Sequence, residues 1–231
     1  MLDLSKFELF TFDCYGTLID WETGIFSALK PVLAAHGKSI SDADLLAIYG
    51  DSELRAESGE YRSYREVLRS VVQSFGEHLS FTPTAQEMDS LPNSVARWQP
   101  WPDTVAALQR LGERGQLAII SNIDDDMFAA TQRLLQTSFA SITTAQQARC
   151  YKPGLEIFRL ALGRTTVPRD RILHVGQSIY HDVLPAQSLG LSTVWVNRPS
   201  PRAGIGAVKA ATGRPDLEVR DLASLAKQAG G

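Results

Sequence analysis

The sequence predicts an α/β fold: a doubly wound parallel sheet with a helical domain inserted near its start. Several apolar runs are too short for typical helices and indicate buried strands. Helical patterns alternate with these runs, as expected for a parallel sheet. One long stretch has helical periodicity and no convincing strand. With 231 residues, 44% of them hydrophobic and 21% charged, the chain has the composition of a folded protein.

The predicted elements follow from these patterns in order along the chain. Strands are expected at residues 7–12 (FELFTF), 117–120 (LAII), 172–175 (ILHV) and 192–196 (STVWV). Helices are expected at residues 103–111, 126–135, 155–162 and 221–227. Open α/β sheets of this kind place ligand sites at the carboxyl ends of their strands.

Residues 21–97 interrupt the alternation of strands and helices. Their apolar residues recur at helical spacing, as at Leu45, Leu46 and Tyr49. The following segment, residues 98–103, contains two prolines and is interpreted as a hinge back to the sheet. We therefore assign residues 1–20 and 98–231 to the sheet domain and residues 21–97 to the inserted helical domain.

Charge and composition indicate which classes of binding partner and which cellular compartment to expect. A net charge of -3 and a pI near 5.8 give no attraction to nucleic acid or to anionic membranes. The first residues lack the basic region of a secretory signal, and no apolar run is long enough to span a membrane. Only Cys14 and Cys150 occur, which suits a reducing compartment. We expect a cytoplasmic protein that binds a small molecule.

Polar residues follow the predicted strands, where they would converge on one pocket. Each alone is typical of a helix cap or a turn, but together they offer two carboxylates, hydroxyls and an amine. The set consists of Asp13 with Thr17, Ser121 with Asn122, Lys152, and Gln177, Ser178 and Asp182.

The same residues resemble the four motifs of the haloacid dehalogenase superfamily: Asp13-Cys-Tyr-Gly-Thr17, Ser121-Asn122, Lys152-Pro153 and Gly176-Gln-Ser-Ile-Tyr-His-Asp182. The resemblance implies a Rossmann-like core with a helical cap domain and an aspartate nucleophile that forms a covalent intermediate. It also implies that the second-motif hydroxyl and the third-motif lysine hold the substrate anion and the aspartate. A homodimer is a further expectation from the family.

Two positions favour a dehalogenase over a phosphatase of the same superfamily. Phosphatases carry a second aspartate two residues after the nucleophile, because an alkoxide leaving group needs a proton. Tyr15 stands there, whereas a halide leaves without protonation. Gln177 replaces an acid that helps to hold magnesium, and an amide offers Mg²⁺ only a neutral oxygen. We therefore expect no metal cofactor, with magnesium required only if the phosphatase alternative holds.

The expected reaction has two steps. Asp13 displaces halide from C2 of a small 2-haloacid, and water then attacks the aspartyl carbonyl of the resulting ester. Lys152 keeps Asp13 ionised, Asp182 positions Lys152 or the water, and Thr17 and Ser178 support this network. The expected substrate contacts are Tyr15, Ser121, Asn122, Gln177 and Arg65.

Three features differ from the best-known dehalogenases of this superfamily. Their fourth motif has a different sequence, and Phe158 stands where they have a tyrosine. Their halide-binding arginine lies in a Trp-Arg segment that is absent here, so Arg55, Arg62 and Arg65 are the candidates for its task. A non-catalytic binding protein with the same fold is the alternative from another class, and the four retained motifs argue against it.

Overall fold

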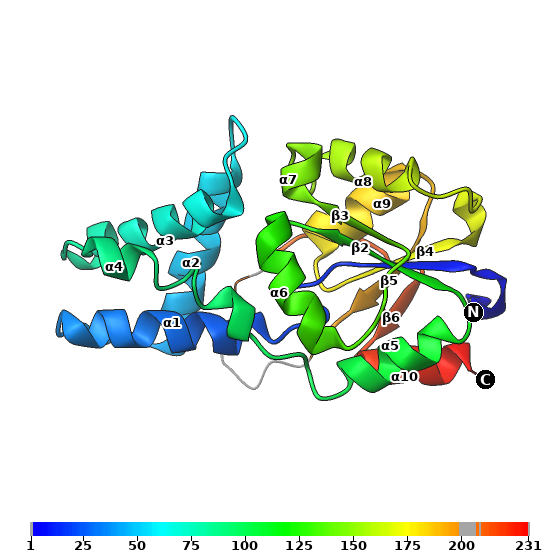
Figure 1. Cartoon of the computed structure of the whole chain (residues 1–231), viewed down its shortest axis with the longest axis horizontal. Helices are drawn as coiled ribbons and strands as arrows, with labels where there is room; N and C mark the ends of the chain where they lie inside the picture. The colour runs from blue at the N-terminus through cyan, green and yellow to red at the C-terminus, as the bar shows by residue number, and fades with distance from the viewer. Residues whose placement is uncertain (1, 199–206, 208, 231) are drawn as a thin grey trace.

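The computed structural model describes residues 2–198, 207 and 209–230. Its centre is a six-stranded parallel sheet in the order β3-β2-β1-β4-β5-β6 (Figure 1). The strands are β1 (Leu9–Phe12), β2 (Gln116–Ser121), β3 (Ser141–Thr144), β4 (Ile172–Gly176), β5 (Ser192–Val196) and β6 (Leu217–Val219). The predicted fold class is confirmed.

Helices cover both faces of this sheet. Figure 1 shows α7 (Ala145–Ala148), α8 (Leu155–Leu162) and α9 (Leu184–Ser188) above it, and α5 (Thr104–Gly112) and α10 (Leu222–Ala229) below it. Another α-helix of the sheet domain, α6 (Asp125–Leu135), follows β2. Every residue of β1 and β4 is buried, as expected for strands covered on both faces.

The sequence interpretation missed β3 and β6, the two edge strands of the sheet. Edge strands have a neighbour on one side only and need less continuous apolar sequence than central strands. Ser141–Thr144 reads SITT, and Leu217–Val219 reads LEV, so neither contains a long apolar run. The four central strands lie at or within two residues of their predicted positions.

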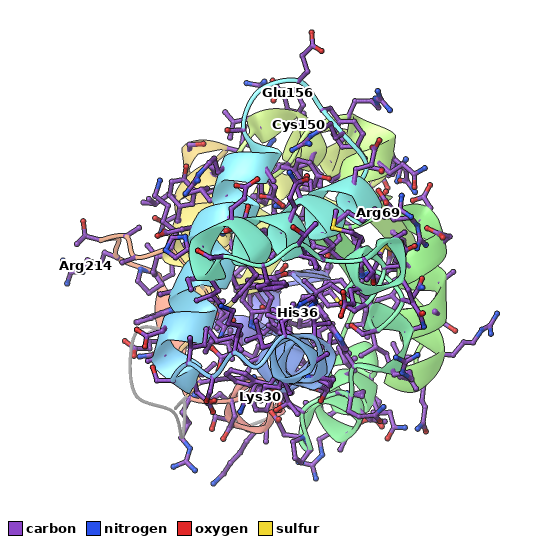
Figure 2. The ribbon with its side chains drawn as sticks, turned by 90° about the vertical axis from the view of Figure 1, so that its left-hand side faces the viewer. Lys30, His36, Arg69, Cys150, Glu156 and Arg214 are labelled. Atoms are coloured by element: carbon purple, nitrogen blue, oxygen red, sulfur yellow. The ribbon has the colours of Figure 1, made fainter. Side chains whose placement is uncertain are left out.

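Four α-helices lie between β1 and α5: α1 (Trp21–Ala35), α2 (Asp42–Glu57), α3 (Tyr64–Leu79) and α4 (Ala85–Met88). We call them the cap; they stand to the left of the sheet domain in Figure 1 and face the viewer in Figure 2. The α3 helix begins with a capping box formed by Ser63 and Glu66. The apolar sides of α2 and α3 pack together and bury Leu45, Leu46 and Val67.

The chain leaves and re-enters the sheet domain through two adjacent segments. Ile19 and Pro100 form an antiparallel bridge, and the amide of Asp20 donates to the carbonyl of Gln99 at 2.9 Å. The two ends of the cap are thus fixed beside each other, next to the loop that follows β1. No helix in the described part of the chain is long and apolar enough to span a membrane.

Candidate active site

The turn after β1 fixes Asp13 in one orientation. Its side chain is buried, and Oδ2 accepts a hydrogen bond of 2.6 Å from the hydroxyl of Thr17. The Thr17 hydroxyl accepts in turn from the amide of Gln177 at 2.8 Å. Gly16 has a φ of +93°, and a β-carbon there would lie 1.9 Å from Oε1 of Gln177. Glycine is therefore required for the tight turn that joins Asp13 to Thr17.

Lys152 lies between two buried carboxylates. Its Nζ donates to Oδ1 of Asp13 and to Oδ1 of Asp182, at 2.7 Å each, and to the carbonyl of Ile120 at 3.0 Å. Burial lowers the pKa of the ammonium, but the two carboxylates outweigh it and raise the pKa well above its usual value. Lys152 is thus a permanent cation with all three of its protons donated.

Asp182 is engaged at both oxygens. Oδ1 faces Lys152 and lies 3.3 Å from Nε2 of His174, and Oδ2 accepts from the amide of Ser178 at 3.2 Å. Burial raises the pKa of Asp182, but Lys152 and His174 outweigh it, and the pKa falls well below the usual range. Asp182 is therefore a fixed anion that holds Lys152 in place.

Asp13 differs from Asp182 in the balance of these effects. Burial raises the pKa of Asp13, and the nearby charge of Asp182 adds to that shift. The Lys152 ammonium and the Thr17 hydroxyl oppose it, because both favour the ionised carboxylate. The arrangement gives a buried carboxylate that is oriented by two donors and is poorly solvated, which suits a nucleophile.

Two residues at the end of β2 contribute to the site: Ser121 has a hydroxyl without a hydrogen-bond partner among the described residues, and Asn122 binds the backbone of Lys152. Ser121 is fully buried, and its Oγ has no hydrogen-bond partner among the described residues. Asn122 accepts from the amide of Lys152 at 2.7 Å and donates to its carbonyl at 3.2 Å. Asn122 therefore holds the Lys152 backbone, and Ser121 offers its hydroxyl to a ligand.

Tyr15 is fixed by packing and by one hydrogen bond. Its hydroxyl lies 2.9 Å from Oγ1 of Thr131 on α6, and its ring meets Trp98 edge to face at 5.9 Å. Burial raises the pKa of this phenol well above 10. A group with such a pKa neither gives nor takes a proton readily near neutrality.

These residues and the cap enclose a cavity of about 60 Å³. The residues predicted from sequence that line it are Asp13, Tyr15, Ser121, Asn122, Lys152, Gln177, Ser178 and Asp182. Thr17 lies behind them and contacts Asp13. Ser178 lines the cavity, but its hydroxyl pairs with Nδ1 of His181 at 3.1 Å and does not reach Asp13 in the hydrogen bonds of the described residues.

The family model for haloacid dehalogenase-like hydrolases matches residues 7–190, which is most of the chain. The chain belongs to the haloacid dehalogenase-like hydrolases. It is 27% identical over 226 residues to (S)-2-haloacid dehalogenase H-109 of Pseudomonas putida, covering 96% of this chain and 97% of that protein. It is 28% identical over 133 residues to the pyrimidine 5'-nucleotidase YjjG of Escherichia coli, covering 54% of this chain and 57% of that protein.

A solved structure of L-2-haloacid dehalogenase from Xanthobacter autotrophicus superimposes with a TM-score of 0.79. The alignment covers 97% of this chain and 99% of that one, at 22% sequence identity. At this identity the likeness supports the fold alone.

Arg65 does not line the cavity of this haloacid dehalogenase-like hydrolase, contrary to the expectation. It lies in the first turn of α3, and its guanidinium reaches out to Asp126 at 3.0 Å and to Asn93 at 3.4 Å. Arg62 donates to the carbonyl of Ala56 and to Ser70, and Arg55 is exposed. None of these three arginines takes the place of the expected halide-binding residue.

The sequence interpretation missed the carboxylates that the cap contributes. Glu53 and Glu57 of α2 line the cavity, together with Tyr64 at the start of α3. Tyr49, Glu53 and Glu57 recur at intervals of four residues, so they lie on one side of α2. This spacing, which places both glutamates on the same side of the helix as Tyr49, was the sequence signal that could have indicated them.

Magnesium does not fit the carboxylates of this hydrolase on the sheet side of the cavity. All four oxygens of Asp13 and Asp182 already accept hydrogen bonds, and one oxygen of each accepts from Lys152. Mg²⁺ prefers charged oxygen ligands in near-octahedral geometry, and here the ammonium of Lys152 already pairs with both carboxylates. Gln177 adds only a neutral oxygen. The described residues contain no group of three or more His, Cys, Asp or Glu side chains that could hold a metal ion.

Proposed function

We propose that this hydrolase removes halide from small 2-haloacids through a covalent ester on Asp13, without a metal. The observation that carries the proposal is the setting of Asp13: a buried carboxylate held by Lys152 and Thr17, with Tyr15 two residues later. The extensive match to a protein named (S)-2-haloacid dehalogenase supports the same reaction.

In the first step a carboxylate oxygen of Asp13 attacks C2 of the substrate. An oxygen–carbon bond forms, the carbon–halogen bond breaks, and halide leaves with the electron pair. The substrate carboxylate binds the free hydroxyl of Ser121 and backbone amides near Tyr15 and Asn122. Lys152, which already pairs with Asp13 and Asp182, keeps the nucleophile oriented while the substrate binds.

In the second step water attacks Cγ of Asp13. The bond between Cγ and the ester oxygen breaks, the 2-hydroxy acid leaves, and the carboxylate of Asp13 is restored with one oxygen from water. Asp182 contributes by holding Lys152, because its oxygens already have partners. Tyr15 takes no proton in either step.

A paired assay tests this proposal against the phosphatase alternative. Halide release is measured from 2-chloropropionate and chloroacetate with a chelator present, and phosphate release is measured from an aryl phosphate with magnesium. We expect halide release alone. Phosphatase turnover without halide release would overturn the proposal.

The covalent step is tested by one turnover in ¹⁸O-labelled water, followed by mass analysis of the peptide that contains Asp13. We expect the label in the Asp13 carboxylate. An unlabelled Asp13 would show that water attacks the substrate directly.

A further inference from the structure

Glu53 and Glu57 bring two carboxyl groups from the cap into the cavity that holds Asp13. Oε1 of Glu53 accepts from the hydroxyls of Tyr49 at 2.8 Å and Tyr64 at 2.6 Å. Burial raises the pKa of Glu53, and the two phenol donors oppose that shift because they favour its ionised form. Glu53 is thus a fixed acceptor whose position is set by α2 and α3.

Glu57 is held far more loosely. Its two oxygens lie 3.5 and 3.4 Å from Nδ2 of Asn122, which is long for a hydrogen bond. No cation pairs with it among the described residues. Glu57 therefore faces the cavity with oxygens that have only these long hydrogen bonds to Asn122.

The surroundings of Glu57 make its carboxylate more basic than that of an ordinary glutamate. Burial raises its pKa well above 4.5, and the charge of Glu53 raises it further, whereas Lys152 and Asn122 lower it. Tyr49 on α2 and Tyr151 before Lys152 also lie within electrostatic reach of Glu57. A carboxylate with a raised pKa is a stronger base than an ordinary surface glutamate.

Asp182 and His181, which also line the cavity, are poor bases for water. The oxygens of Asp182 are occupied by Lys152, His174 and the Ser178 amide. Burial lowers the pKa of His181 to about 4, so its imidazole has little affinity for a proton at neutral pH. Glu57 is the loosely bound carboxyl group in the same small space as Asp13.

We propose that Glu57 is the general base for hydrolysis of the Asp13 ester, an inference that rests on the proposed dehalogenation. Glu57 takes one proton from water as the water oxygen bonds to Cγ of Asp13. When the bond from Cγ to the ester oxygen breaks, Glu57 returns that proton to the departing alkoxide of the 2-hydroxy acid. The new carboxyl group of Asp13 loses its remaining proton to solvent. Glu53 acts as a positioning residue, because its charge sets the basicity of Glu57.

Glu57→Gln tests this step, because the amide keeps the shape and cannot accept the proton. We expect a loss of about 100-fold or more in turnover of 2-chloropropionate. Halide should still be released once per enzyme, and the intact protein should gain the mass of a propionate group on Asp13. Glu57→Asp should restore part of the turnover. Glu60→Gln, on the exposed loop after α2, is the matched control and should behave as wild type.

Glu53→Gln tests the positioning role through the pH profile. Turnover should rise with pH as Glu57 ionises, and removal of the neighbouring charge should lower the pKa of Glu57 and move this limb to lower pH. A lower rate with an unmoved limb would show that Glu53 is merely structural.

The results separate the two proposals. If wild type releases halide and Glu57→Gln turns over normally without an adduct, the role of Glu57 is overturned and dehalogenation stands. Loss of the first halide release in folded Glu57→Gln would also overturn a role confined to the second step. If wild type releases no halide and forms no adduct, both proposals are overturned.

Discussion

Nζ of Lys152 lies 2.7 Å from Oδ1 of Asp13, although 138 residues separate them in the sequence. This ion pair joins the end of β1 to the loop before α8, and Asp182 completes it from the segment after β4. Two buried anions therefore depend on one buried cation. Both the stability of the fold and the orientation of the nucleophile depend on this arrangement.

Lys152→Met should destabilise the protein strongly, because it leaves Asp13 and Asp182 buried without a cation. We expect a loss of about 3–5 kcal/mol in the free energy of unfolding, measured with urea at neutral pH. Lys30→Met is the control: Lys30, on the outer side of the cap in Figure 2, pairs with Asp42 at 2.7 Å while largely exposed. That pair should contribute about 0–1 kcal/mol. Equal losses in the two variants would contradict a central role for Lys152.

Tyr15→Phe should affect stability more than chemistry. The phenol hydroxyl contacts Thr131, and its high pKa makes it unsuited to proton transfer. Turnover should therefore fall by much less than the roughly 100-fold loss that is typical when an acid or base is removed. The free energy of unfolding should fall by about 1 kcal/mol. Thr131→Val removes the same hydrogen bond from the other side, and the double variant should lose less than the sum. A collapse of turnover in folded Tyr15→Phe would assign the phenol a chemical role.

Arg65→Ala should leave halide release unchanged, since its guanidinium pairs with Asp126 on the surface. Stability should change by less than about 1 kcal/mol. Ser121→Ala is the comparison, because loss of the free hydroxyl should raise KM for 2-chloropropionate. The measurement is the steady-state kinetics of both variants. A raised KM in Arg65→Ala would show that Arg65 contacts the substrate.

His181 should make the fold less stable as the pH falls. Burial lowers its pKa from 6.5 to about 4, so the unfolded chain takes up the proton first. The resulting loss of stability begins as the pH drops below 6.5 and reaches about 2 kcal/mol at pH 5. Well above pH 6.5 this contribution does not vary. Urea unfolding of wild type and His181→Gln at pH 7 and pH 5 measures it: the variant should lose less, and parallel losses would rule out His181 as the source.

The sequence predicted the central part of the molecule because several independent signals coincide there. The runs at β1 and β4 are mostly apolar, and polar residues follow each of them. Asp13, Lys152 and Asp182 were expected to meet because parallel strands end at one edge of the sheet. The structure brings their charged groups together at hydrogen-bond distance.

The cap side of the cavity was harder to predict, because its residues belong to no strand end. Which helix face turns toward the sheet depends on how α1, α2 and α3 pack, and helical periodicity alone does not reveal it. Arg65 was chosen for its charge, but its place in the first turn of α3 directs it to Asp126. His174 was also missed, since it lies within an apolar run and its partner Asp182 is eight residues away.

The bridge between Ile19 and Pro100 makes the cap an insertion into the sheet domain. Its two ends lie side by side, so the cap can differ in length without a change in the order of the strands. Asp13, Lys152 and Asp182 all lie outside the cap, whereas Glu53 and Glu57 lie within it. A change in the cap would therefore leave the nucleophile and its ion pairs in place, and would alter the carboxyl groups that face them, including the proposed base Glu57.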